Sequence, residues 1–169
     1  MSKIVCVLPI NESQRKKLSQ IAQEVGATIE FSSVNDVTLQ QIQSADCVIG
    51  NAPPQFFKEA HNVKLLQTNS AGTDQYVAPG VLSDKTLLAN ATGAYSPAVG
   101  EHMLAVTLML QKKLHYYRDA QLQKEWSDFG QISSLNGATV LIIGAGDIGL
   151  HYAKLVKLLG AYTIGVKRR

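Results

Sequence analysis

A β-branched apolar segment, TVLII at residues 139–143, leads directly into the glycine pattern GAGDIG at residues 144–149. This order is typical of a strand that turns sharply into a helix around a bound pyrophosphate. Gly144 permits the tight turn, Gly146 lets the backbone approach the pyrophosphate, and Gly149 lets the helix pack closely on the strand. The pyrophosphate would accept hydrogen bonds from free N–H groups at the positive end of the helix. The candidate binding residues are Gly144, Gly146, Asp147, Ile148 and Gly149.

The residues after these glycines complete a β-α-β unit. Apolar residues recur at helical spacing, and Gly160 stands where a glycine commonly follows the end of a helix. Residues 162–166 then indicate a second buried strand. Glycines at this spacing also occur in ordinary loops, but the complete order predicts a dinucleotide-type fold, with another doubly wound domain as the alternative. The apolar helical positions are Ile148, Tyr152, Val156 and Leu159.

The first half of the chain alternates short apolar segments with helix-start signals. Asn11 with Gln14, and Thr38 with Gln41, have the spacing of a capping box, and a Pro-Pro pair at residues 53–54 favours the start of a short helix. Repeated β-α-β order implies a parallel sheet with helices on both faces. The predicted strands are residues 3–8, 27–31, 47–50, 65–68 and 87–90.

The segment GAYSP at residues 93–97 indicates a boundary between two parts. Ser96 is expected to cap a helix with Pro97 at its first position, and the apolar stripe continues towards Lys124. A continuous helix of that length would span about 40 Å. Such a helix would link two domains or pack on a partner subunit, or it would be a long core helix. Its stripe consists of Val99, Met103, Val106, Leu110, Leu114 and Tyr117.

The composition is that of a globular protein, with 46% apolar and 17% charged residues. The formal net charge of +3 is carried by Lys167, Arg168 and Arg169, so the rest of the chain is formally neutral and no nucleic-acid surface is expected. Cys6 and Cys47 lie in apolar segments and are expected to be reduced thiols in the cytoplasm, with a disulfide or metal pair as a minor alternative. No signal peptide or membrane-spanning segment is predicted.

A second loop, TNSAGTD at residues 68–74, follows the fourth predicted strand. Open α/β sheets bind ligands at the carboxyl ends of their strands, and small residues there expose backbone N–H groups that can hold a carboxylate. Asp74 is expected to cap the short helix that follows. Ser70, Ala71 and Gly72 are therefore candidate substrate-binding residues, although the same residues would also suit an ordinary turn.

Together these segments resemble the D-isomer-specific 2-hydroxyacid dehydrogenases over essentially the whole chain. NSAGTD at residues 69–74 is similar to the substrate loop of that family, PAVGEHML at residues 97–104 to the start of its interdomain helix, and GAGDIG at residues 144–149 to its cofactor motif. The resemblance implies an NAD(H)- or NADP(H)-dependent oxidoreductase acting on a small 2-oxo or 2-hydroxy acid. It also implies that backbone amides near Ala71 and Gly72 hold the substrate carboxylate, and that an intact member is a homodimer.

The resemblance predicts an α/β chain of two parts. Residues 1–95 would form a flavodoxin-like parallel-sheet substrate domain, and residues 96–169 the interdomain helix and the first β-α-β unit of a Rossmann domain. The family's catalytic Arg, its acidic residue and its His all lie downstream of the cofactor motif, so no catalytic residue can be assigned. We therefore expect the N-terminal half of such an enzyme, inactive alone, or else a non-catalytic dinucleotide-binding or assembly module.

None of the histidines offers a substitute for the missing catalytic groups. No pair of them has metal-ligand spacing, so no metal site is predicted. Glu101 and His102 are adjacent, and adjacent residues on a helix point in different directions. The histidines, each expected to be structural or solvated, are His61, His102, His115 and His151.

The end of the second predicted strand in the β-α-β unit bears on the choice of cofactor. NAD-specific Rossmann domains place an acidic residue there to hold the ribose 2′-hydroxyl. In this chain the position is Lys167, followed by Arg168 and Arg169. A cationic cluster attracts a 2′-phosphate, so NADP(H) is expected to be preferred over NAD(H), unless these residues are simply solvated.

Overall fold

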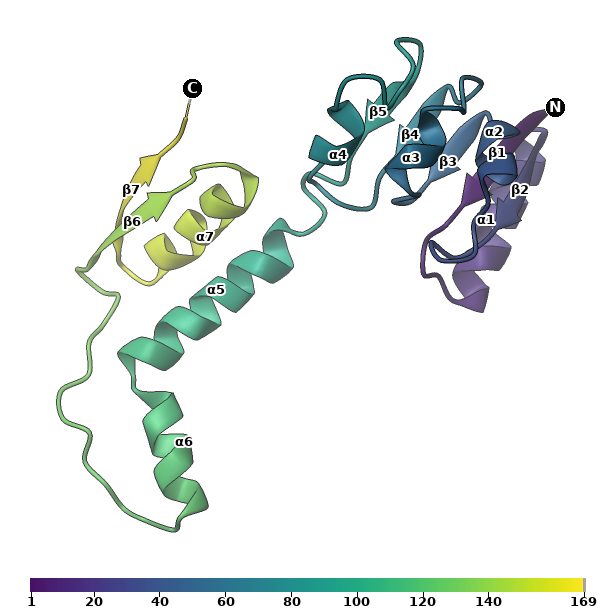
Figure 1. The fold of residues 1–169 in the computed structure, drawn as a ribbon. Coiled ribbons are helices and arrows are strands. Elements are labelled where there is room, and N and C mark those ends of the chain that lie inside the picture. The colour runs from purple at the N-terminus through teal and green to yellow at the C-terminus, as the bar shows by residue number, and fades with distance from the viewer. Residues whose placement is uncertain (169) are drawn as a thin grey trace. The chain divides into compact units, whose positions relative to one another are not determined.

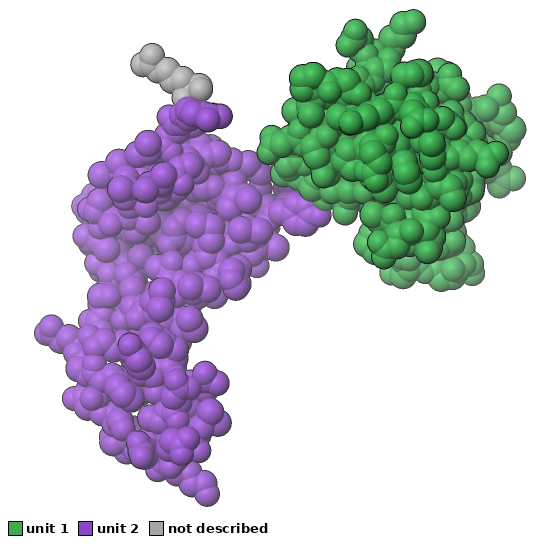
Figure 2. Space-filling model, viewed as in Figure 1, with its two compact units in different colours: residues 1–92 green, residues 93–169 purple. Residues whose placement is uncertain are grey.

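The computed structural model describes residues 1–168 and divides the chain into two compact units, residues 1–92 and 93–169 (Figure 2). In unit 1, five parallel strands form one sheet in the order β2-β1-β3-β4-β5 (Figure 1). This is the strand order of flavodoxin-like folds, as the sequence predicts. The strands are β1 (Ser2–Cys6), β2 (Ala27–Phe31), β3 (Cys47–Ile49), β4 (Leu65–Gln67) and β5 (Leu87–Ala89).

Four helices cross between the strands of unit 1, as parallel pairing requires. Both predicted capping boxes are confirmed, because the side chains of Asn11 and Thr38 each accept from the backbone N–H of the third helical residue, and their own backbone N–H groups donate to its side chain in return. The prediction that Asp74 caps a helix is wrong. Thr73 is the cap residue, Asp74 is the first residue inside the helix, and neither side chain caps it. The helices are α1 (Glu12–Glu24), α2 (Leu39–Gln43), α3 (Pro54–Phe57) and α4 (Asp74–Val77).

The core of unit 1 combines side chains from the central strands and from α2, α3 and α4. The ring of Phe57 meets the ring of Tyr76 edge-on, with centroids 5.8 Å apart. The hydroxyl of Tyr76 donates to the carbonyl of Ala52 at 2.8 Å, so this buried polar atom is satisfied. This packing holds the loops after β3 and β4 against a rigid base. The largest fully buried side chains include Tyr76, Phe57, Ile42, Leu66, Val5 and Val48.

Unit 2 begins with two helices, α5 (Ser96–Gln111) and α6 (Leu114–Leu122). The prediction of one continuous helix is therefore wrong. Lys113 has a left-handed backbone with a φ of 57°, and its ammonium group donates to the carbonyl of Phe129. The N–H of Ser133 donates to the carbonyl of Gln111 at 3.2 Å, so a distant loop satisfies the end of α5. The boundary at the other end also differs, because Tyr95 is the cap residue and Ser96 lies inside the helix.

The second part of unit 2 is a two-stranded parallel sheet joined by one helix. Its elements are β6 (Thr139–Ile143), α7 (Asp147–Leu158) and β7 (Tyr162–Val166), which confirms the predicted β-α-β unit. Gly160 follows the end of α7 with a φ of 83°, as expected for a glycine in this position. One face of the sheet packs on α7, and its core residues are Leu135, Ile142, Tyr152, Val156 and Ala161.

The other face of the β6–β7 sheet is apolar and exposed. Its residues alternate along each strand with the buried ones, and the register pairs Leu141 with Ile164 and Ile143 with Val166. Their exposed fractions are 58% and 83% on β6 and 55% and 51% on β7. Among the described residues, no helix is long and apolar enough to cross a membrane.

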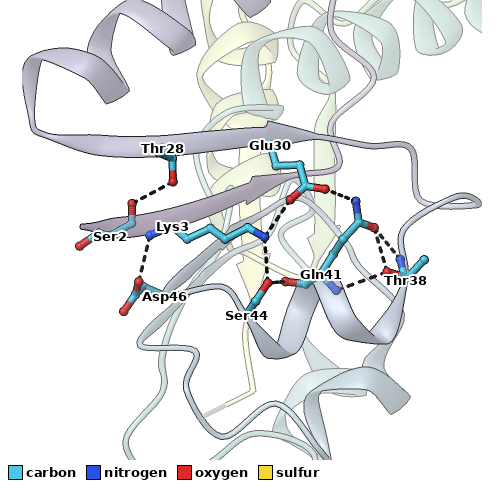
Figure 3. Close-up of polar contacts among 8 residues, drawn as sticks. All are labelled: Ser2, Lys3, Thr28, Glu30, Thr38, Gln41, Ser44 and Asp46. Carbon is cyan, nitrogen blue, oxygen red and sulfur yellow. Dashed lines mark hydrogen bonds and ion pairs between the residues drawn. The ribbon is translucent and has the colours of Figure 1, made fainter.

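A polar network in unit 1 links β1, β2 and α2 (Figure 3). The Lys3 ammonium lies 2.9 Å from a Glu30 carboxylate oxygen and donates to the Ser44 hydroxyl at 2.9 Å. Glu30 also accepts from the side-chain amide of Gln41, which belongs to the α2 capping box. The hydrogen bond from Gln41, followed by the interaction with Lys3, holds the pKa of Glu30 below its ordinary value near 4.5. The network therefore ties α2 to β1 and β2.

We predict that Glu30→Gln reduces the acid sensitivity of unit 1. Because the folded pKa of Glu30 is lowered, its stabilising contribution is present above the unfolded pKa and is lost as the pH falls through the folded pKa. The contribution at neutral pH is below about 1 kcal/mol, since the ion pair is partly exposed. Urea unfolding of both proteins between about pH 6 and 3 measures it. Glu59→Gln, an exposed residue outside the network, is the control. An identical pH dependence for Glu30→Gln and the unmutated chain would contradict this account.

Candidate functional site

The glycine loop, residues 144–149, joins the carboxyl end of β6 to the start of α7. Gly144 has a φ of 101°, a backbone conformation that favours glycine. The N–H groups of Gly144 and Ala145 both donate to the carbonyl of Val166, at 2.8 and 3.0 Å. The loop is thus fixed to the last residue of β7 as well as to β6.

The three motif glycines have different surroundings. A Cβ atom at Gly144 or Gly146 would meet no atom within 4 Å, so the space above both residues is open. A Cβ atom at Gly149 would lie 2.2 Å from the carbonyl oxygen of Gly144 and 3.1 Å from Cγ2 of Ile142. Gly149 therefore allows α7 to approach β6, whereas Gly144 and Gly146 leave open space at the turn.

The amino-terminal end of α7 has no side-chain cap. Gly146 is the cap residue and makes no side-chain hydrogen bond, and the first helical bond runs from the Leu150 N–H to the Gly146 carbonyl at 2.9 Å. The Asp147 carboxylate instead accepts from the hydroxyl of Ser96 on α5. The N–H groups of the first turn of α7 therefore receive no hydrogen bond from a cap side chain.

Lys167 and Arg168 follow β7 directly and are exposed. The glycine loop donates to the carbonyl of Val166, and Lys167 is the residue that follows Val166. The predicted cofactor residues therefore lie together at the carboxyl ends of β6 and β7. Arg169 lies outside the described residues.

The substrate loop, residues 68–74, lies at the carboxyl end of β4 in unit 1. The Thr68 hydroxyl donates to the Ser70 carbonyl at 2.9 Å, and the Ser70 hydroxyl donates to the Gly72 carbonyl at 2.8 Å. Ala71 and Gly72 are exposed. These internal bonds are accepted by carbonyl groups of the loop.

Two asparagines that the sequence analysis missed hold this loop from neighbouring strands. The Asn51 amide accepts from the N–H of Asn69 and donates to the Ser70 hydroxyl, both at 3.0 Å. The Asn90 amide donates to the carbonyl of Ala71 at 2.9 Å. Asn51 comes soon after β3 and Asn90 immediately after β5, and this placement at the carboxyl ends of strands was the available signal.

The histidines occupy elements other than the two loops. His61 precedes β4, at the opposite end of that strand from the substrate loop. His151 lies on α7 and packs against Gly100 of α5, where its ring would meet an added Cβ at 2.6 Å. His102 lies on α5 and His115 on α6.

The residues suited to metal or redox chemistry are equally sparse. No group of three or more metal-ligating side chains is present among residues 1–168. Cys6 and Cys47 are free thiols, and burial raises the pKa of Cys47.

The comparisons with known proteins agree with this geometry. Residues 104–169 match the family model described as "D-isomer specific 2-hydroxyacid dehydrogenase, NAD binding domain". An uncharacterized protein of Corynebacterium melassecola is 31% identical over 134 residues, which cover 76% of this chain and 43% of that protein. A D-lactate dehydrogenase of Treponema pallidum is 32% identical over 109 residues, 63% of this chain and 33% of that enzyme.

A solved structure extends the likeness to the fold of nearly the whole chain. A D-isomer specific 2-hydroxyacid dehydrogenase family protein from Aeromonas salmonicida has a TM-score of 0.82 at 24% identity. The match covers 99% of this chain and 54% of the Aeromonas chain. The chain therefore spans about half, or less, of the length of the relatives it matches.

We predict that two substitutions in the glycine loop separate folding from binding. Gly149→Ala places a Cβ against backbone that cannot move aside, which should destabilise unit 2 by about 1–3 kcal/mol. Hydrogen exchange of the β6 amides should accelerate accordingly. Gly146 has a φ of −88°, which alanine adopts, and a Cβ there would meet no atom within 4 Å. Gly146→Ala should therefore leave the hydrogen exchange of β6 unchanged, while the added methyl group should weaken NADH binding. Unchanged β6 exchange in Gly149→Ala, or unchanged NADH affinity in Gly146→Ala, would refute the respective assignment.

Proposed function

We propose that this chain, of which residues 104–169 match the NAD binding domain of the D-isomer specific 2-hydroxyacid dehydrogenases, forms part of an oxidoreductase for a small 2-oxo or 2-hydroxy acid. The reaction is hydride transfer between a nicotinamide cofactor and the α-carbon of the acid. The observation that carries the proposal is the glycine loop at the carboxyl ends of β6 and β7, where α7 starts without a side-chain cap, within the matched NAD binding domain. When bound, the nicotinamide supplies the hydride chemistry, and the protein supplies position and electrostatics.

The glycine loop is the proposed cofactor-binding element. The N–H groups of Gly146, Asp147 and Ile148 donate to the pyrophosphate, and the α7 dipole favours the negative charge. Gly144 keeps the turn tight, and Gly149 keeps α7 close to β6. Binding in this mode requires no rearrangement of the loop, because the bonds to Val166 already fix it.

The substrate loop is the proposed carboxylate-binding element. The N–H groups of Ala71 and Gly72 donate to the substrate carboxylate, and Ser70 supports them through its bond to the Gly72 carbonyl. Asn51 and Asn90 keep the loop in this shape from either side. An arrangement of small residues with ordered backbone favours recognition of the carboxylate that all 2-hydroxy acids share.

We further propose a preference for NADP(H). The adenosine ribose of a Rossmann-bound cofactor lies near the end of the second strand, which here is followed by Lys167 and Arg168. Cationic side chains at this position can donate charge-assisted hydrogen bonds to a 2′-phosphate.

We predict that the chain binds NADPH about tenfold more tightly than NADH, and that Lys167→Asp reverses this preference. Isothermal titration of both cofactors measures the two affinities directly. Lys154→Asp makes the same charge change at an exposed position on α7 and should leave the ratio unaltered. Equal affinities in the unmutated chain, or an unmoved ratio in Lys167→Asp, would contradict the NADP(H) preference without affecting the proposed reaction class.

The second candidate function is a non-catalytic dinucleotide-binding or assembly module. The observation that favours it is that neither loop contains a histidine, the commonest general acid or base. We propose that these 169 residues by themselves do not catalyse hydride transfer, since loss of an acid/base group costs on the order of a hundredfold or more. Turnover near about 1 s⁻¹ with NADPH and a panel of 2-oxo acids would contradict this proposal. Homodimer formation and a cytoplasmic location also remain predictions.

A further inference from the structure

Asp147 places a carboxylate beside the glycine loop. It is the first residue of α7 and directly follows Gly146, the cap residue of that helix. Its side chain is exposed, whereas its partner Ser96 is 4% exposed. A carboxylate at this position stabilises the helix by its interaction with the helix dipole, but it also lies where the proposed function requires an anion to bind.

The first turn of α7 is capped differently from the first turn of α1. The first turn of α1 is closed by a capping box, with Asn11 and Gln14 bonded to each other's backbone. The first turn of α7 has a glycine as its cap residue, which offers no side-chain capping bond, and the Asp147 carboxylate follows it directly. Instead the buried hydroxyl of Ser96 donates to it, which directs it towards α5.

The charge of Asp147 opposes the ligand that the loop would hold. A pyrophosphate carries negative charge, and two unit charges about 4 Å apart in water change an equilibrium constant by about fivefold, which is the relevant limit because Asp147 is exposed. The attraction from the α7 dipole and from Lys167 acts in the opposite direction. The affinity of the loop therefore depends on where the Asp147 carboxylate points.

We propose that Asp147 limits the affinity of the glycine loop for the pyrophosphate of a dinucleotide, and that Ser96 is a positioning residue that reduces this penalty by holding the carboxylate towards α5. This inference rests on the proposed function, because it assigns a role to residues of the same site. A freed carboxylate can turn back to the open N–H groups of α7 and compete with the ligand for them.

Titration calorimetry of the full chain with ADP-ribose tests both roles. Asp147→Asn should tighten binding by about three- to tenfold at low ionic strength, and the gain should shrink in about 0.5 M salt. Ser96→Ala should weaken binding by about two- to fivefold, and should have no effect once Asp147 is Asn. Adenosine, which has no phosphate, should bind all four proteins equally. Glu12→Gln removes a first-turn charge from α1 and is the matched control.

The double-mutant cycle distinguishes positioning from structural damage. If Ser96→Ala merely loosened the α5–α7 packing, it would weaken ADP-ribose binding in the Asp147→Asn background as well, and the positioning role would be wrong. If the unmutated chain binds ADP-ribose and Asp147→Asn binds no more tightly, the inference fails while the proposed function stands. If neither protein binds ADP-ribose or NADH, the proposed function fails and the inference fails with it.

Discussion

The close approach of α7 to β6 at Gly149 is the contact on which the candidate cofactor site depends. A side chain there would overlap the carbonyl oxygen of Gly144, so the absence of a Cβ atom sets how near the helix begins to the strand end. The bonds from Gly144 and Ala145 to the Val166 carbonyl then fix the same turn to β7. As a result the uncapped start of α7 and the basic residues after β7 meet at one sheet edge, where parallel α/β sheets bind ligands.

Electrostatic balance at this edge is the second constraint. The helix dipole and Lys167 favour an anion, and Asp147 opposes it from the first helical position. Ser96 links that carboxylate to α5, so a residue outside the glycine motif contacts a charged group of the candidate site. The substrate loop follows a comparable principle, because its shape depends on Asn51 and Asn90 from two flanking strands. Side chains outside the local motif thus contribute at both places, by holding the Asp147 carboxylate at one and the loop backbone at the other.

The sequence was most informative where structure is determined locally. The capping boxes at Asn11 and Thr38, and the strand–glycine–helix unit, depend on residues a few positions apart, and the structure confirms them. The break between α5 and α6 is accompanied by a hydrogen bond from Lys113 to the Phe129 carbonyl and one from the Ser133 N–H to Gln111, contacts more than ten residues apart that apolar periodicity cannot reveal.

The sequence analysis missed some residues of the candidate sites for the same reason. Asn51 and Asn90 belong to no recognisable motif, because their partners lie across the sheet edge rather than along the chain. Ser96 looked like a cap by its residue type and its place before a proline. In the structure its hydroxyl has a partner on another helix, and the cap position shifts to Tyr95.

Mapping of ADP-ribose binding on the ¹⁵N-labelled chain by backbone amide chemical shifts tests the central claim most directly. The account predicts that the largest shifts occur in residues 144–149 and at Lys167, with the substrate loop at residues 68–74 unaffected. Saturable binding with its largest shifts in unit 1, and none in the glycine loop, would contradict the assignment of the cofactor site.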